Sequence, residues 1–323
     1  GFIGSNFINH LLTEKNDKEL TVVNVDKITY AGSGKNIELM GLDKDPRYSF
    51  IQVDISDSKF IKSVFETFSP ELIFNFAAES HVDRSILDSS LFRRTNFEGT
   101  GVLLDVSLKK GIEKFIQIST DEVYGSLSLN DQSSDERDIL KPTSPYSSSK
   151  ASADLMALSY FHTHGLPVLI TRSANNYGPF QFPEKILPLF ITNLLEGKKV
   201  PLMWSEENPG LNVRDWLHVD DNCRAIWCVA QHGQIGEIYN IPGRNETTNI
   251  KITKMILNFF GFGEEMIEKI PHRKGHDFRY SINGDKLMGL GFQYRHRDLR
   301  LEMGEVIEWY KQNDSWWRPL KVK

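Results

Sequence analysis

The chain has 323 residues, a formal net charge of −5 and 25% charged residues, which is the composition of an ordinary globular protein. This charge leaves no basic footprint for nucleic acid, and no apolar run reaches the roughly 18 residues of a membrane span. Cys223 and Cys228 have neither disulfide nor metal-ligand spacing, so we expect no metal centre. With no visible signal peptide, we expect a cytoplasmic protein of one large or two modest domains.

The sequence opens on Gly1-Phe2-Ile3-Gly4 and a predicted helix over 5–15. This pattern is typical of the end of a glycine-rich dinucleotide turn, in which glycine lets the backbone approach a pyrophosphate. The strand and the first glycine that normally precede such a turn are absent from the sequence. We expect that strand at the centre of the sheet, and therefore expect residues to be missing before Gly1.

A predicted strand over 20–25 ends in Asp26, about 22 residues after Gly4. An acid at this distance suits the hydroxyls of an adenosine ribose and disfavours the extra phosphate of NADP, so NAD is the expected cofactor. A short helix over 36–42 and a strand over 48–53 follow. Asp54 closes that strand, and it suits the N-cap of a helix beginning near Ser58 as well as it suits a contact with a ligand.

Two further strands, over 72–76 and 115–118, carry polar or small residues at their carboxyl ends, where open α/β sheets place their ligands. Ala77 and Ala78 leave room for a cofactor. Asp121 and Glu122 are adjacent carboxylates in a place that we expect to be partly dry. Such surroundings push two pKa values apart and leave one group as acid and the other as base.

Long helices are predicted over 91–110 and 147–164, and Tyr146 and Lys150 stand four residues apart at the start of the second. This spacing places both on one helical face. A cation beside a phenol favours the phenolate, which would let Tyr146 act as a base near neutral pH. A surface pair of Tyr and Lys is the alternative. A strand over 167–171 and a nominal domain boundary after Ser173 follow.

Together, these residues resemble the extended short-chain dehydrogenase/reductase family, and Thr120-Asp121-Glu122 resembles its dTDP-glucose 4,6-dehydratase branch. Related 4-epimerases and decarboxylases lack the adjacent acid pair. The resemblance implies a Rossmann-type doubly wound parallel sheet over 1–173 and a smaller α/β substrate domain over 174–323. The segment 211–242 is expected to return to the first domain. A homodimer through a four-helix bundle is also implied.

The same resemblance implies the site residues. The catalytic residues are Thr120, Asp121, Glu122, Tyr146 and Lys150. The residues that bind NAD are Gly1, Phe2, Ile3, Gly4, Asp26, Lys27, Thr29, Gly32, Asp54, Ile55, Ala77, Ala78, Ser80, Thr95, Tyr146, Lys150 and Asn176. Those that bind the nucleotide sugar are Ser80, His81, Thr120, Asn175, Lys185, Leu187, Pro201, Met203, Arg214, Asn249, Arg273 and His276.

Several of these residues also have structural interpretations. Lys185 suits a solvated helix, Arg214 an ion pair with Asp215, and Asn249 the N-cap of a helix running to Phe260. His272 and Lys274 depart from the family's Asp-Arg-Pro-Gly-His-Asp run.

Three functions are therefore compared. A dehydratase uses every element of the pattern, with Asp121 as acid and Glu122 as base by resemblance. An NAD-dependent epimerase or decarboxylase has no use for the acid pair. A non-enzymatic NAD-binding module predicts erosion of Tyr146 and Lys150, yet both are present.

Overall fold

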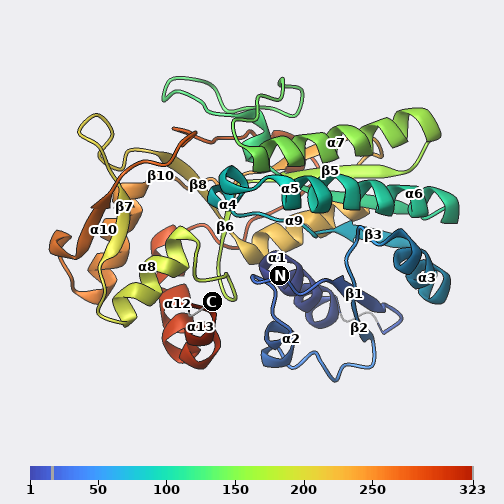
Figure 1. The fold of residues 1–323 in the computed structure, drawn as a ribbon, viewed down its shortest axis with the longest axis horizontal. Helices are drawn as coiled ribbons and strands as arrows, with labels where there is room; N and C mark the ends of the chain where they lie inside the picture. The colour runs from blue at the N-terminus through green and yellow to red at the C-terminus, as the bar shows by residue number, and fades with distance from the viewer. Residues whose placement is uncertain (16–17, 322–323) are drawn as a thin grey trace.

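A computed structural model describes residues 1–15 and 18–321, and shows an α/β molecule with two packed parts (Figure 1). The first part is built on a four-stranded parallel sheet in the order β3-β4-β5-β9. These strands are β3 (Leu72–Asn75), β4 (Lys114–Thr120), β5 (Val168–Ser173) and β9 (Ile238–Ile241).

Two earlier strands, β1 (Val22–Asp26) and β2 (Tyr48–Gln52), form a separate parallel pair. Among the described residues, no ladder joins β1 to β3. The break falls where the sequence analysis places an additional central strand, and that strand remains a prediction.

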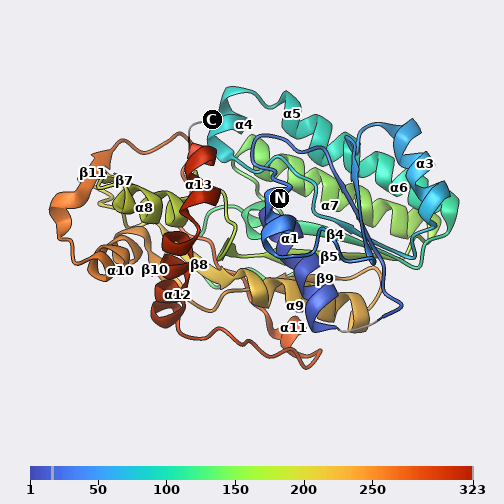
Figure 2. The same ribbon diagram turned by 90° about the horizontal axis from the view of Figure 1, so that it is seen from below.

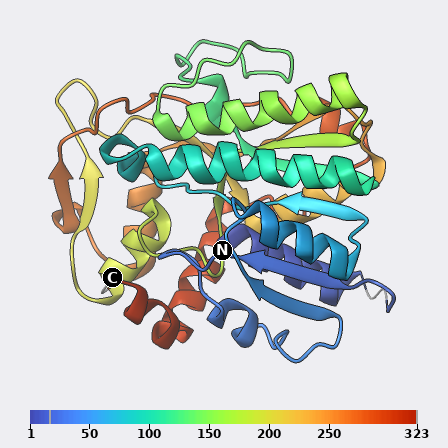
Figure 3. The ribbon, with the colours of Figure 1, turned by 45° about the vertical axis from the view of Figure 1, so that its right-hand side comes forward.

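Helices cover both faces of the four-stranded sheet, because successive side chains of a strand point to opposite faces. Phe115 of β4 packs toward α6 (Thr100–Lys110) and α7 (Pro145–His164). The next residue, Ile116, packs on the other side with α1 (Phe2–Asn9) and α9 (Val219–His232). Figure 3 shows α6 and α7 lying side by side along the first face. The edge is completed by α3 (Ser58–Phe68), which packs against α6.

The predicted helices over 5–15 and 91–110 are confirmed as helical. Each contains a π-helical segment, η1 (His10–Glu14) in the first and η2 (Arg93–Gly99) in the second. A π-helical turn takes one residue more than an α-helical turn, so it rotates the side chains that follow it. Short helices complete this part: α2 (Lys35–Leu39), α4 (Val82–Leu87), α5 (Ser90–Phe92) and the 3₁₀ turn η3 (Asp121–Tyr124).

The second part, on the left in Figure 2, is made of small sheets and helices around the buried Trp216, Tyr310 and Trp317. Its strands are β6 (Asn175–Tyr177), β7 (Val200–Met203), β8 (Val213–His218), β10 (Glu246–Thr248) and β11 (Ile267–Ile270). Its helical elements are α8 (Ile186–Leu195), α10 (Asn249–Phe260), η4 (Glu264–Met266), α12 (Leu299–Gln312) and α13 (Asp314–Lys321). The short helix α11 (Asp285–Met288) contacts β9 of the first sheet.

Strand β9 pairs with β5 and helix α9 packs on the same sheet, whereas β8 pairs with β6 and β10 of the second part. The expected return over 211–242 remains a prediction. The division at residues 173 and 174 remains a prediction. In the part of the chain that the structure describes, no helix combines the length and apolar character needed to cross a membrane.

Two expected N-caps are wrong. Asp57, not Asp54, caps α3, and its side chain accepts from the N–H of Phe60. Thr248, not Asn249, caps α10 and accepts from the N–H of Lys251. The helices begin at Ser58 and Asn249, so the residue directly before each start takes the N-cap position.

Candidate active site

Strand β4 delivers Thr120, Asp121 and Glu122 to its carboxyl end, where the chain turns into η3. The Thr120 hydroxyl caps this turn by accepting from the N–H of Glu122 at 3.3 Å, and it lies 3.1 Å from Asp121 Oδ1. The turn ends at Gly125, whose φ is +84° and where a Cβ would lie 2.3 Å from the carbonyl oxygen of Lys141. Only glycine fits that position, so the geometry after the acid pair is fixed.

The two adjacent carboxyl groups have different surroundings. Burial, and after it the neighbouring Glu122, raise the pKa of Asp121 to about 8. Asp121 Oδ2 is buried without a hydrogen-bond partner. These conditions favour a neutral, protonated Asp121 at neutral pH.

Glu122 is held differently. Burial raises its pKa as well, but Lys185, Arg214 and Arg273 all oppose this effect because their charges favour the carboxylate. Between the two acids, the cations favour the anion on Glu122. The surroundings therefore favour the neutral form more strongly at Asp121 than at Glu122, and the assignment of acid and base remains a prediction.

Tyr146 and Lys150 lie in the first turns of α7 and are both buried, so the alternative of a surface pair is wrong. Lys150 Nζ donates to the carbonyl oxygen of Ile118 at 2.6 Å, and burial lowers the pKa of Lys150 to about 8. The pKa of Tyr146 is raised, first by burial and then by Glu122. The structure thus differs from the expected phenolate, because the Lys150 ammonium is bound to β4 and two carboxyl groups lie near the phenol.

The predicted substrate cations converge from separate elements. Lys185 stands at the N-cap position of α8, and its Nζ donates to the Ser80 carbonyl at 2.8 Å, which is not the position of a solvated helix lysine. Arg214 on β8 donates to the carbonyl oxygens of Val213 and Asp277 at 2.7 and 2.9 Å.

Arg214 makes no ion pair with Asp215 in the described parts of the chain. Asp215 instead accepts from the N–H groups of Gly243 and Asn245 at 2.6 and 2.7 Å. The two side chains point to opposite sides of β8, as neighbours on a strand do, so the expected alternative of an ion pair is wrong.

Three other predicted substrate residues have polar contacts of their own. Arg273 is 3.6 Å from Asp83, and His81 Nε2 is 3.6 Å from Glu184. His276 Nδ1 lies 2.9 Å from Nδ1 of His272. Leu187 is 1% exposed and packs in the core of the second part, so its side chain is not available to a ligand.

Some of the predicted cofactor residues contact one another beside the first turn. Asp26 Oδ2 lies 3.1 Å from the Gly1 nitrogen, and Asp26 Oδ1 accepts from the N–H of Ile28 at 2.7 Å. Lys27 Nζ donates to Asp54 Oδ2 at 2.8 Å. Ile55 is buried against Gly99, where a Cβ would lie 2.6 Å from its Cδ1, so Ile55 supports η2 through its side chain.

Several residues that the sequence analysis assigned to the site have a buried polar atom without a hydrogen-bond partner. They are Asp121 Oδ2, Asn175 Oδ1, Asn176 Oδ1, His81 Nδ1, Asn249 Oδ1 and Arg273 Nε. Buried polar groups in native proteins are almost always paired, so these atoms are available to a polar ligand.

Sequence reasoning did not assign a role to three residues near the acid pair or Lys150, which are Tyr280, Asp277 and Asp154. The Tyr280 hydroxyl lies 3.5 Å from Glu122 Oε2 and donates to Asp277 Oδ2 at 2.5 Å. Asp154 lies one turn after Lys150 in α7 and is buried. Its position four residues after Lys150 was a readable signal, whereas Tyr280 reaches Glu122 only through the tertiary fold.

Comparison with known proteins agrees with this geometry. The family described as GDP-mannose 4,6 dehydratase matches residues 1–285. A dTDP-glucose 4,6-dehydratase of Streptomyces antibioticus is 47% identical over 327 residues, with 100% of this chain and 93% of the relative covered.

Two solved structures are informative. The dTDP-glucose 4,6-dehydratase of Streptomyces venezuelae, solved with NAD and dTDP bound, has a TM-score of 0.93 and 42% identity, covering 99% of this chain and 97% of that chain. A UDP-glucose 4-epimerase of Thermotoga maritima has a TM-score of 0.86 and 27% identity, covering 97% of this chain and 96% of that chain. The fold is common to both activities, but the identity is higher to the dehydratase, and this chain belongs to the family of the dTDP-glucose 4,6-dehydratases.

Proposed function

We propose that this protein converts dTDP-glucose to dTDP-4-keto-6-deoxyglucose with NAD as its cofactor. The observation that carries the proposal is the acid pair, in which Asp121 is held neutral while three cations favour the anion on Glu122. The relatives named above as dTDP-glucose 4,6-dehydratases, one of them solved with NAD and dTDP, support it.

The residues present fit a dinucleotide. Gly1 and Gly4 bear no side chain at the start of α1, Asp26 lies beside them, and Asn176 presents an unpaired buried oxygen. When bound, NAD supplies a hydride acceptor that becomes a hydride donor later in the same reaction. The remaining residues that we assign to it are Phe2, Ile3, Lys27, Thr29, Gly32, Asp54, Ile55, Ala77, Ala78, Ser80, Thr95, Tyr146 and Lys150.

The side chains then divide the proton transfers. We assign to Tyr146 the removal of the proton from the sugar's 4-hydroxyl. This step requires the phenolate, which the positive charge of bound NAD would favour. Thr120 is assigned to bond the sugar, and Lys150 lies one turn after Tyr146 in α7. Oxidation at carbon 4 acidifies the proton on carbon 5, which Glu122 removes. Asp121 gives its proton to the departing 6-hydroxyl, and water is lost across carbons 5 and 6. General acid–base groups of this kind each contribute about 10²–10⁴-fold in rate.

We assign binding of the nucleotide diphosphate to the cations that surround Glu122 on its outer side, chiefly Arg214 and Arg273. A guanidinium fork matches the geometry of phosphate oxygens. Further contacts to the nucleotide sugar are assigned to Ser80, His81, Asn175, Lys185, Pro201, Met203, Asn249 and His276, and to the backbone of Leu187.

A homodimer through a four-helix bundle is part of this proposal. Leu91, Phe97 and Leu155 are 49%, 38% and 59% exposed, and lie on the elements from α5 to α7 that the bundle would use. Exposed apolar residues gathered on neighbouring helices are typical of an interface. A cytoplasmic location is likewise proposed.

The decisive experiment is incubation with dTDP-glucose and NAD, followed by mass spectrometry of the sugar nucleotide. We expect loss of one water from dTDP-glucose. UDP-glucose is tested in parallel, because it carries uracil in place of thymine. The variant Glu122→Gln keeps the shape of the side chain but cannot accept a proton. We expect it to oxidise carbon 4, seen as reduced-cofactor absorbance, without losing water.

A product of unchanged mass from the wild-type protein would replace the proposal with an epimerase. If the wild type bound NAD but neither oxidised nor dehydrated the sugar, the non-enzymatic module would replace it.

A further inference from the structure

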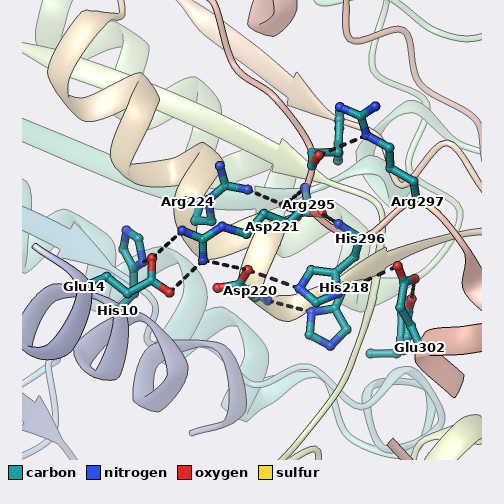
Figure 4. Close-up of polar contacts among 12 residues, drawn as sticks. His10, Glu14, His218, Asp220, Asp221, Arg224, Arg295, His296, Arg297 and Glu302 are labelled. Carbon is teal, nitrogen blue, oxygen red and sulfur yellow. Dashed lines mark hydrogen bonds and ion pairs between the residues drawn. The ribbon is translucent and has the colours of Figure 1, made fainter. Parts of the chain in front are cut away.

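A second cluster of ionisable side chains lies where the first helix meets α9, shown in Figure 4. His10 and Glu14 come from η1, and Asp220 comes from the first turn of α9. One donor atom from each of the three lies within 4.8 Å of the other two, and no other such group occurs in the described ranges 1–15 and 18–321. The dehydration chemistry proposed above does not use any of these residues.

His10 is the residue that points to a ligand. It is only 4% exposed, yet neither of its ring nitrogens has a hydrogen-bond partner. Its Nδ1 lies 3.4 Å from Glu14 Oε2, so the ring is directed into the cluster. A buried imidazole with an unused lone pair is an unsatisfied polar group and also a good metal ligand.

Arg295 supplies the positive charge at this place. Its guanidinium donates to Glu14 Oε1 and Oε2 at 2.8 and 2.9 Å, and lies 3.6 Å from Asp220 Oδ2. This side chain is 51% exposed. Arginine only donates hydrogen bonds and stays protonated, so it neutralises the carboxylates but binds to them as a replaceable surface ion pair.

Asp220 also has a histidine partner. His296 Nε2 lies 3.2 Å from Asp220 Oδ2, the oxygen that Arg295 approaches, and the His296 ring stacks on His218 with centroids 3.7 Å apart. A histidine that holds a ligating carboxylate in place is a common outer partner of metal sites. His296 therefore restricts the position of the Asp220 carboxylate beside His10 and Glu14.

We propose that His10, Glu14 and Asp220 bind a divalent transition-metal ion, with Zn²⁺ as the expected ion. One imidazole nitrogen and two carboxylate oxygens match the ligands that zinc accepts, and water completes the coordination. The ion takes the place of the Arg295 guanidinium, which turns outward to solvent. It joins the first helix to α9, so its effect is to stabilise the fold.

The sequence analysis expected no metal centre because it searched for short spacings. His10 and Glu14 stand four apart, but Asp220 lies far along the chain, and only the packing of α1 on α9 brings it to them.

The proposal is tested by calorimetric titration of chelator-treated full chain with ZnCl₂ alone. We expect one zinc per chain and a higher melting temperature when zinc is bound. Arg295→Gln removes the competing cation, so it is expected to bind zinc at least about ten-fold tighter than the wild type. Glu14→Gln and His10→Gln are expected to bind at least about ten-fold weaker. Glu196→Gln is the matched control, since Glu196 accepts from Lys198 and Lys321 but has no imidazole in its cluster.

Co²⁺ gives a second readout that does not depend on stability. Its visible spectrum should show a nitrogen ligand in the wild type and in Arg295→Gln, and lose that signature in His10→Gln. Circular dichroism without added metal verifies that each variant is folded. Absence of zinc binding by both the wild type and Arg295→Gln would overturn the proposal. Equal binding by wild type and Glu14→Gln would also overturn it, by showing an adventitious ion elsewhere.

Discussion

Lys150 Nζ donates a hydrogen bond of 2.6 Å to the carbonyl oxygen of Ile118, so the ammonium group is fixed to the strand that carries the acid pair. Burial lowers the pKa of Lys150 to about 8, and the carboxylate of Asp154 opposes this effect. Asp154 itself accepts from Ser119 Oγ at 2.9 Å and from Arg172 Nε at 3.0 Å. The charge on Lys150 therefore depends on Asp154, an acid that is fully buried in the protein.

Asp154→Asn should move the alkaline limb of the rate to lower pH. The carboxylate favours the ammonium form, so its removal lowers the pKa of Lys150 further below about 8, and the active form is lost earlier as pH rises. The measurement is kcat against pH, with Thr171→Val as a buried control that changes no charge. Because Arg172 loses its partner, we also expect destabilisation of about 3–5 kcal/mol. An alkaline limb that stays in place would show that Asp154 has only a structural role.

Asp121→Asn should stabilise the fold, and increasingly so as pH rises. The pKa of Asp121 is about 8 in the folded state against an ordinary value of 3.8, so between these pH values the folded protein holds a proton that the unfolded chain releases. Stability from this group is complete below about pH 4 and is lost on the way to about pH 8, by at most about 1.4 kcal/mol for each pH unit. Asparagine does not titrate.

The check on Asp121→Asn is the difference in melting temperature between variant and wild type at pH 5, 7 and 9. A difference that stays constant over this range would mean that Asp121 is ionised in the folded state at neutral pH. Dehydration should be lost in the same variant, because no proton is available for the departing hydroxyl.

Arg214→Lys should weaken binding of the nucleotide sugar. Arg214 is buried, stacks over Tyr280 with its guanidinium 4.3 Å from the ring centroid, and donates to the carbonyl oxygens of Val213 and Asp277. An ammonium group cannot reproduce this fork, and a lost charged hydrogen bond of about 1.5–3 kcal/mol corresponds to roughly 10–150-fold in KM. The exposed Arg244 on the neighbouring loop provides the control variant Arg244→Lys. Equal KM values for the two variants would remove Arg214 from the binding site.

Leu155→Glu should dissociate the proposed dimer. Leu155 is 59% exposed on α7, and a carboxylate there would be buried against the apolar surface of a second copy. Light scattering coupled to gel filtration measures the mass in solution. Leu301→Glu on α12, where the leucine is 65% exposed, is the matched control and should leave the mass unchanged. A wild type that runs as a monomer would refute the four-helix bundle.

Part of the fold could be predicted from the sequence because it depends on short, local residue patterns. The apolar run before Thr120 predicted β4, and the interval of four from Tyr146 to Lys150 placed both in α7. Helix starts were less accessible. Asp57 and Thr248 are the caps in place of Asp54 and Asn249, because the N-cap is the residue directly before the first helical one, and that position depends on where the preceding segment ends.

The sequence by itself determined which chemical groups are available: an adjacent acid pair, a phenol with a lysine one turn away, and a glycine turn followed by Asp26. The tertiary structure decided their charges. Asp121 and Glu122 are neighbours with the same functional group. Arg214 favours the anion of both, whereas Lys185 and Arg273, from distant segments, are main influences on Glu122. Electrostatic energies depend on distance and burial, which a linear sequence does not contain. For the same reason, the contact of His10 and Glu14 with Asp220 exists only after α1 has packed on α9.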